Sequence, residues 1–407
     1  MNCGQTILQV VLESRWVHVA DVAHQNHNQP DFLNSELNVR TVQVVDDSAA
    51  ERTCLYCGTS NSEERDDCIV CHSSFIPEEE IAQAEDELLP VATQPDMTDL
   101  QVDFEEENGL SHPNWRKMYQ QISASRAEAD WWDIYHELAK QWLLRLKADL
   151  GGYYHVYESE NFVVLSAEGA TATRTIIGYA ESSLAVLQRF CRGIQPEETY
   201  GKRAMLIFTD QDDYYAYVSH FHRDGAHSLS AGTMLSRGYM HIAFPFTWIF
   251  SARRIITHEL VHNCIAHLRI PSWLHEGVAQ KLERLVMNTR AFVLEHELAM
   301  EHHAHWTEQN IQEFWSGASF YVGDERNKLS YSLAEILTEF LSSDWNAFLE
   351  FISQADYRDA GQDAALRTLH RCLGETIGQF LGPGNWRPQR MAIAERMRDL
   401  ESKSERV

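Results

Sequence analysis

The sequence lacks any hydrophobic run long enough to cross a membrane. Its most apolar stretch, residues 242–250, is short and contains Pro245, whereas a membrane-spanning helix needs about 20 consecutive apolar residues. A secretory signal is missing as well, because the apolar residues 6–12 have no basic residue before them and are followed by Glu13 and Arg15. These absences predict a cytoplasmic protein with no membrane partner.

Basic residues are scarce in the first part of the chain. Residues 1–110 contain 23 acidic residues and four basic ones, in a chain whose 60 acidic and 34 basic residues give a net charge of −26. Such a charge repels the phosphate backbone, so we expect no nucleic acid partner. The acidity is densest in residues 77–110, which hold twelve acidic residues, three prolines and no basic residue. That composition predicts a disordered linker.

The pattern of a disulfide framework is also absent. Four of the eight cysteines, Cys3, Cys191, Cys264 and Cys372, are scattered, and the other four are grouped. This distribution suits a reducing compartment and a single cysteine metal site.

The grouped cysteines form two C-x-x-C pairs separated by ten residues: Cys54, Cys57, Cys68 and Cys71. Because four thiolates complete a tetrahedral structural zinc site, we predict a zinc finger over residues 51–76. The pattern resembles the Ran-binding-type finger and the wider zinc-ribbon class, although the tryptophan that usually precedes the first cysteine is absent. The resemblance implies a structural knuckle or a module that binds a protein partner, with ubiquitin binding not expected.

The other boundaries follow from changes in pattern. Residues 1–50 have strand-like stretches and are predicted to be a short β-rich or interaction segment. Residues 111–150 carry an apolar stripe at helical spacing. Residues 151–386 are predicted to be the main domain, and residues 387–407 a charged tail. Within the main domain we expect strands at 162–165 and 204–209, helices at 172–191 and 212–220, and a hairpin of 231–235 with 239–244.

One motif in the main domain predicts a metal site with a catalytic group beside it. Residues 258–262 read H-E-L-V-H, inside a stretch from 250 to 270 that has no proline or glycine and repeats apolar residues at helical spacing. Residues four apart share one face of a helix, so His258 and His262 direct both imidazoles toward one point. Neutral imidazole suits zinc, and Glu259 lies beside the same point as a possible general base.

The third ligand has two possible sources. The metzincin pattern requires glycine and histidine at positions that Ile265 and Leu268 occupy here, so it fails. The other source is a carboxylate on the following helix. Pro271 ends the first helix, Ser272 can cap the next, and Glu276 lies in its first turns.

H-E-L-V-H followed by P-S-W-L-H-E-G-V-A resembles the gluzincin metallopeptidases, specifically the bacterial peptidase-MA-like group, over about residues 153–386. The resemblance implies an α+β, zincin-like catalytic domain in which a mixed sheet packs on the motif helix and a helical subdomain follows. It implies His258, His262 and Glu276 as ligands of a catalytic zinc. It also implies Glu259 as the base in hydrolysis of a peptide or protein substrate. The alternative is a catalytically inactive gluzincin-fold binding module or adaptor, tethered through the zinc finger.

Two further roles follow from the same resemblance. Residues 239–244 are expected to form an edge strand that binds an extended substrate near Tyr239 and His241, although an interior strand fits their composition equally well. Tyr331, at the start of a helix, is expected to donate a hydrogen bond to the oxyanion, with His241 as its rival and a core tyrosine as the alternative. His275 lies about 100° round the helix from the third ligand, so we expect it to point away from the metal.

Overall fold

The computed structural model describes residues 51–53, 60–62, 102–107, 109–151, 153–196, 200–221, 230–236, 238–287, 289, 292–321 and 326–395. The predicted segment 1–50 and the four cysteines of the predicted finger lie outside these residues. Beside those cysteines, β1 (Glu51–Thr53) pairs in antiparallel orientation with β2 (Ser60–Ser62).

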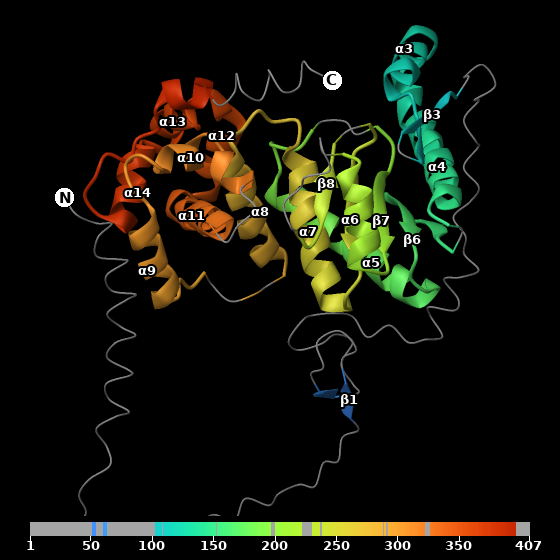
Figure 1. The fold of residues 1–407 in the computed structure, drawn as a ribbon, viewed down its shortest axis with the longest axis horizontal. Coiled ribbons are helices and arrows are strands. Elements are labelled where there is room, and N and C mark those ends of the chain that lie inside the picture. The colour runs from blue at the N-terminus through green and yellow to red at the C-terminus, as the bar shows by residue number, and fades with distance from the viewer. Residues whose placement is uncertain are drawn as a thin grey trace, which may run out of the picture.

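A mixed five-stranded sheet lies in one half of the main body (Figure 1). Its strand order is β5-β6-β7-β9-β8, where β6, β7 and β9 are parallel and the two outer strands run antiparallel to their neighbours. The strands are β5 (His155–Glu158), β6 (Phe162–Ser166), β7 (Arg203–Phe208), β8 (Thr233–Leu235) and β9 (His241–Pro245). The predicted strands and the β8–β9 hairpin are therefore confirmed, and Gly238 in its turn has a φ of +80°.

Helices cover both faces of this sheet, which explains why the three parallel strands are apolar except at one end residue each, Ser166, Arg203 and His241. Helices α4 (Trp131–Asp149) and α6 (Gln211–Ser219) cover one face, and α5 (Ala170–Phe190) and α7 (Ile249–Ile265) cover the other. Along β7 the side chains alternate between these two layers, with Leu206 toward α4 and α6 and Ile207 toward α5 and α7.

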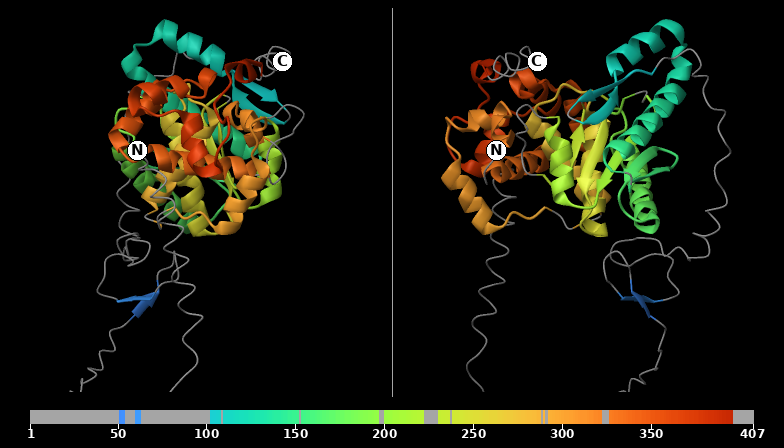
Figure 2. Two further views of the ribbon diagram at one scale, coloured as in Figure 1. Left: turned by 90° about the vertical axis from the view of Figure 1, so that its left-hand side faces the viewer. Right: turned by 45° about the vertical axis from the view of Figure 1, so that its right-hand side comes forward.

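The second half of the body is helical. Helix α8 (Ser272–Val286) packs between α7 and α11 (Arg326–Leu341) and so joins the two halves (Figures 1 and 2). A single core cluster runs from Ile207 in the sheet to Trp273 in α8 and Phe351 beyond it. The remaining elements are α9 (His296–His305), α10 (Ile311–Trp315), a 3₁₀ turn (Ala318–Tyr321), α12 (Trp345–Gln354), a 3₁₀ turn (Tyr357–Asp359), α13 (Gln362–Ala364), a π-helical turn (Ala365–Leu369) and α14 (Leu373–Leu381). The α+β class is confirmed.

The ends of the main body differ from the predicted boundaries. The acidic stretch was expected to remain a linker through residue 110, but β3 (Phe104–Glu107) and β4 (Leu110–Pro113) form an antiparallel hairpin. They lead into α3 (Trp115–Ser125), a 3₁₀ turn (Glu128–Asp130) and α4. At the other end, Ile393 is 2% exposed and packs in the core, so the fold continues past residue 386.

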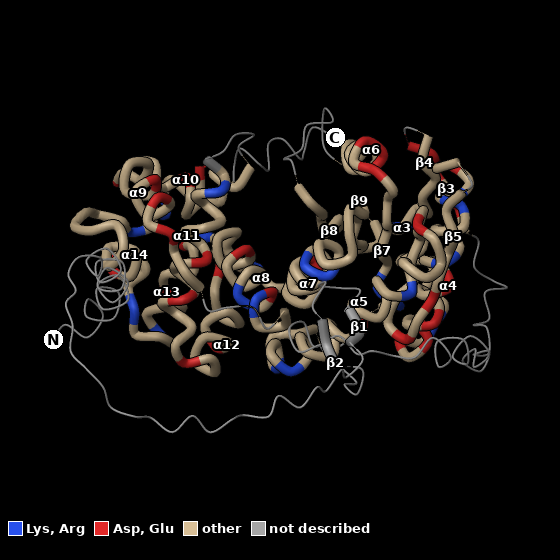
Figure 3. Tube along the Cα trace, turned by 90° about the horizontal axis from the view of Figure 1, so that it is seen from below, with Lys and Arg blue, Asp and Glu red and all other residues tan. Residues whose placement is uncertain are grey.

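Charges of both signs are scattered over the helices of the body (Figure 3). Among the helices that the structure describes, none has the length and apolar character needed to cross a membrane.

Candidate metal centre

Helix α7 brings the two motif histidines together. His258 and His262 lie one turn apart on the face that α8 meets, with ring centroids 4.9 Å apart and ring planes at 80°. The opposite side of α7 is anchored in the core by Ile256, Leu260 and other buried apolar residues. The predicted helix is thus confirmed, and burial of its apolar side fixes which way the histidines point.

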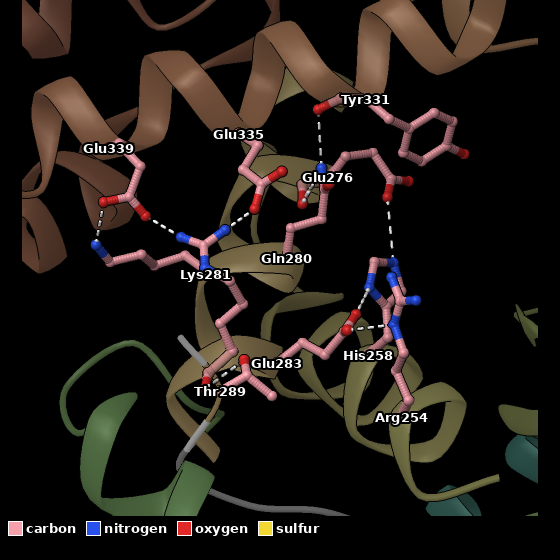
Figure 4. Close-up of polar contacts among 11 residues, drawn as sticks. Arg254, His258, Glu276, Gln280, Lys281, Glu283, Thr289, Tyr331, Glu335 and Glu339 are labelled. Carbon is pink, nitrogen blue, oxygen red and sulfur yellow. Dashed lines mark hydrogen bonds and ion pairs between the residues drawn. The ribbon is translucent and has the colours of Figure 1, made fainter. Parts of the chain in front are cut away.

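Helix α8 supplies the third side chain. It begins at Ser272 directly after Pro271, which occupies the N-cap position with extended backbone. The predicted cap by the Ser272 side chain is wrong, because Ser272 is already the first helical residue and its side chain makes no capping hydrogen bond. Glu276 follows in the second turn and extends toward the histidines of α7 (Figure 4).

The three side chains converge on one point. Oε2 of Glu276 lies 3.4 Å from Nε2 of His258 and 3.5 Å from Nε2 of His262. One ligand atom from each residue lies within 4.8 Å of the other two. Ligand atoms about 2.0–2.2 Å from a tetrahedral zinc are about 3.3–3.6 Å apart. Both measured Nε2–Oε2 separations fall in this range, so the donor set fits zinc.

The electrostatics of the cluster also favour a cation. Oε2 of Glu276 is buried and has no hydrogen-bond partner among the described residues, an arrangement that costs free energy unless a charge compensates it. Burial alone would raise the pKa of Glu276, but His262 and His258 hold it below its usual range. Conversely, burial would lower the pKa of His258, but Glu276 and Glu283 raise it to about 10. The carboxylates around the two histidines therefore favour positive charge at this point.

Glu259 lies beside the cluster and is not part of the ligand set. It is 7% exposed, and its carboxylate accepts a hydrogen bond from the backbone N–H of Met234 in β8. Burial raises the pKa of Glu259, while His262 and His258 act in the opposite direction. A raised carboxyl pKa suits a group that must take up and release a proton near neutral pH.

Tyr331 lies in α11, the helix that packs against α8. Its half-buried ring packs edge-on against Phe320 with centroids 5.3 Å apart, and its backbone oxygen accepts a hydrogen bond from Gln280 at 2.9 Å. Figure 4 shows the ring on the same side of α8 as the carboxylate of Glu276. Burial and the negative charges of Glu276 and Glu259 raise the pKa of the phenol, which therefore keeps its proton.

The structure contradicts the predicted substrate role of Tyr239 and His241. Strand β9 is interior, since it pairs with β7 on one side and β8 on the other. His241 is 1% exposed, and its Nε2 lies 2.8 Å from the hydroxyl of Tyr217, in the layer on the opposite face of the sheet from α7. The hydroxyl of Tyr239 donates to the backbone oxygen of Lys202 at 2.5 Å. Both side chains are therefore structural, and the strand at this edge of the sheet is β8.

Two polar contacts of the histidines were missed by sequence reasoning. Oε2 of Glu283 lies 3.1 Å from Nδ1 of His258, and Nδ1 of His275 lies 3.2 Å from Nδ1 of His262. Glu283 follows Glu276 by seven residues, which is about two helical turns, so its presence on the same face was readable from spacing. His275 was expected to point away from the metal, and it is not among the converging ligands. Its contact with Nδ1 of His262 was not foreseen, and it arises because α8 meets α7 with that flank turned toward His262.

No known protein family model matches this sequence, and no curated protein sequence is significantly similar to it. The assignment of function therefore depends on the geometry of the site.

Proposed function

We propose that this protein is a zinc-dependent peptidase of the gluzincin type, with a zincin-like catalytic domain. The observation that carries the proposal is the buried Oε2 of Glu276, which has no hydrogen-bond partner among the described residues and faces the Nε2 atoms of His258 and His262 at 3.4 and 3.5 Å. A zinc ion held by three protein ligands keeps a position for water, which is the catalytic arrangement.

The proposed chemistry divides between the metal and the side chains around it. When bound, zinc would lower the pKa of water and polarise the carbonyl of the scissile peptide bond. Glu259 would accept the proton of the attacking water and deliver it to the leaving amine. Tyr331, which stays protonated, would donate a hydrogen bond to the negative charge that develops on the carbonyl oxygen.

The edge strand β8 is the proposed docking strand for an extended peptide. It has β9 as its one neighbour within the described residues, so backbone groups on its other edge, apart from the N–H of Met234, remain for pairing. It also lies close to the site, because the N–H of Met234 contacts Glu259. A Cβ atom on Gly232, just before β8, would lie 2.3 Å from the side chain of Ile255 in α7. This close packing holds the strand against the motif helix.

The proposal includes a second, structural zinc ion in the finger, bound by Cys54, Cys57, Cys68 and Cys71. The finger would then serve as a structural unit or as a docking module for a protein partner. The cytoplasm is the proposed compartment, since its reducing conditions keep such thiolates available for metal.

The test is metal analysis combined with a cleavage assay on the full-length chain. We expect zinc in the purified protein and cleavage of casein or a peptide library, with Glu259→Gln retaining zinc and losing cleavage by several orders of magnitude. A wild-type protein that binds zinc and cleaves nothing would favour the inactive binding module. A protein that binds no zinc at the site of Glu276 would overturn both.

A further inference from the structure

Helix α8 contributes three side chains to the proposed metal site. Helix α8 supplies the ligand Glu276, and it also contacts the Nδ1 atoms of the two histidines on α7 through His275 and Glu283. We infer that His275 and Glu283 are positioning residues that fix the orientation and tautomer of both histidines so that each Nε2 is available to the metal. The inference rests on the proposed zinc site.

The contact of Glu283 determines the tautomer of His258. Glu283 is 8% exposed, and its two oxygens have separate partners, with Oε2 on Nδ1 of His258 at 3.1 Å and Oε1 on Nε of Arg254 at 2.5 Å. An ionised carboxylate only accepts hydrogen bonds, so Nδ1 of His258 must carry the proton. Its Nε2 lone pair is then directed at the metal point beside Glu276 (Figure 4). Such an outer carboxylate also increases the basicity of the ligand nitrogen.

The contact of His275 acts on His262 in the same way. Two Nδ1 atoms at 3.2 Å form a hydrogen bond only if one of them carries a proton and the other offers a lone pair. As a ligand through Nε2, His262 must be protonated on Nδ1, so it donates and His275 accepts. His275 therefore has its own proton on Nε2, and it holds the ring of His262 without adding a charge.

These contacts depend on a fixed register between α7, α8 and α11. Lys281 of α8 bonds to Glu339 of α11, with Nζ 2.7 Å from Oε2 (Figure 4). Arg284 of α8 pairs with Glu339 and with Glu335. The ion pairs lie on the flank of α8 away from the histidines. They restrain the helix, so that the two outer contacts are preorganised and do not have to form at each binding event.

Glu283 is a charged hydrogen-bond acceptor and His275 a neutral one, so the inference predicts effects of different size for the two residues. A hydrogen bond to a carboxylate is roughly twice as strong as one between neutral groups. Loss of Glu283 should therefore weaken metal binding more than loss of His275. If the two residues served only in packing, the loss of metal affinity would not follow the strength of their hydrogen bonds.

The experiment measures the zinc dissociation constant of the full-length chain by competition with a fluorescent chelator, after a stronger chelator has removed the zinc of this site. The Glu276→Gln variant, which lacks a ligand, identifies the part of the signal that belongs to the cysteine site. Outer-shell substitutions typically weaken metal binding by about 10–100-fold. We expect Glu283→Leu, which removes the acceptor, to fall near the upper end of this range and His275→Leu near the lower end.

Matched variants separate positioning from general loss of structure. Asparagine can place an acceptor oxygen near the position of Nδ1, so His275→Asn should bind zinc within about threefold of wild type while His275→Leu, of similar size, should not. Glu339→Leu removes a carboxylate that also bonds to α8 but contacts neither histidine, and the pair of Arg284 with Glu335 would remain. It should therefore weaken zinc binding much less than Glu283→Leu does. Nitrogen NMR of the zinc-loaded wild type should show both ligand histidines protonated at Nδ1.

The outcomes distinguish this inference from the proposed function. If wild type and Glu276→Gln bind zinc alike, the metal site itself is wrong. If wild type binds zinc at this site but His275→Leu and Glu283→Leu bind it equally well, the site stands and the positioning role is refuted. An effect of Glu339→Leu as large as that of Glu283→Leu would also refute it, because the loss would then reflect only the stability of α8.

Discussion

Gly277 of α8 packs directly against Thr338 of α11. A Cβ atom at position 277 would lie 2.1 Å from Oγ1 of Thr338 and 2.7 Å from the backbone oxygen of Ala334. Both distances are shorter than any ordinary contact, and one of the atoms is backbone that cannot move aside cheaply. The absence of a side chain next to Glu276 thus allows α8 and α11 to approach closely.

Gly277→Ala should therefore lower the free energy of unfolding by about 1–3 kcal/mol, the usual cost of overpacking a core. Gly178→Ala is the matched control, because Gly178 is an exposed position within α5 and a Cβ there would meet nothing within 4 Å. That control should gain about 0.5–1 kcal/mol from the higher helix propensity of alanine. Chemical denaturation of the wild type and the two variants measures the free energy of unfolding, which should fall in Gly277→Ala and rise in Gly178→Ala. An unchanged stability for Gly277→Ala would contradict the packing argument.

Zinc content should report on the two proposed sites separately. Elemental analysis of the wild type should give about two zinc ions per chain, since one site would be a closed cysteine site and the other an open histidine site. Glu276→Gln should lose the ion of the metal cluster, and the double variant Cys54→Ser, Cys57→Ser should lose the other. A wild type with a single zinc that survives the cysteine changes would remove the finger assignment.

Tyr331→Phe should reduce kcat on the order of 10²–10³-fold while leaving KM and zinc content close to wild type, because the lost hydroxyl is needed only as charge develops in the transition state. Tyr153→Phe is the control, since this half-exposed tyrosine donates to Asp213 through a hydroxyl of the same type. A Tyr331→Phe protein with undiminished kcat would show that the hydroxyl of Tyr331 does not stabilise the oxyanion. His241 could not take over the role, because it is buried on the other side of the sheet.

Acid should weaken the fold partly through Glu158 at the end of β5. Burial would raise the pKa of this carboxyl, but hydrogen bonds from Lys202 and Lys140 outweigh it and lower the pKa to about 2. Because this pKa is below its value in the unfolded chain, the stabilisation is complete at neutral pH. It is lost as the pH falls from about 4.5 toward 2.

The measurement for Glu158 is the free energy of unfolding as a function of pH for wild type and Glu158→Gln. The wild type should lose more stability than the variant over this acidic interval, and the two curves should run parallel above about pH 6. Parallel curves through the acidic interval as well would show that the ion pairs with Lys202 and Lys140 contribute nothing.

Local periodicity was sufficient to predict most elements of the main domain. The apolar repeat around the motif predicted α7, and the short apolar runs predicted β6 and β7. These predictions succeeded because the period of a helix or a strand is a property of neighbouring residues. The ends of the fold were predicted less well, since the pairing of β3 with β4 and the burial of Ile393 depend on partners that composition does not reveal.

For the proposed metal site, the sequence by itself was enough to name the candidate donors. The spacing of His258 and His262 places both on one helix face, and Glu276 follows on the next predicted helix. Only the tertiary structure decided that β8 and not β9 is the edge strand, and that His275 and Glu283 contact the two histidines. The physical reason is that strand order and the angle at which α8 meets α7 are set by packing between segments far apart in the sequence, for which local spacing carries no information.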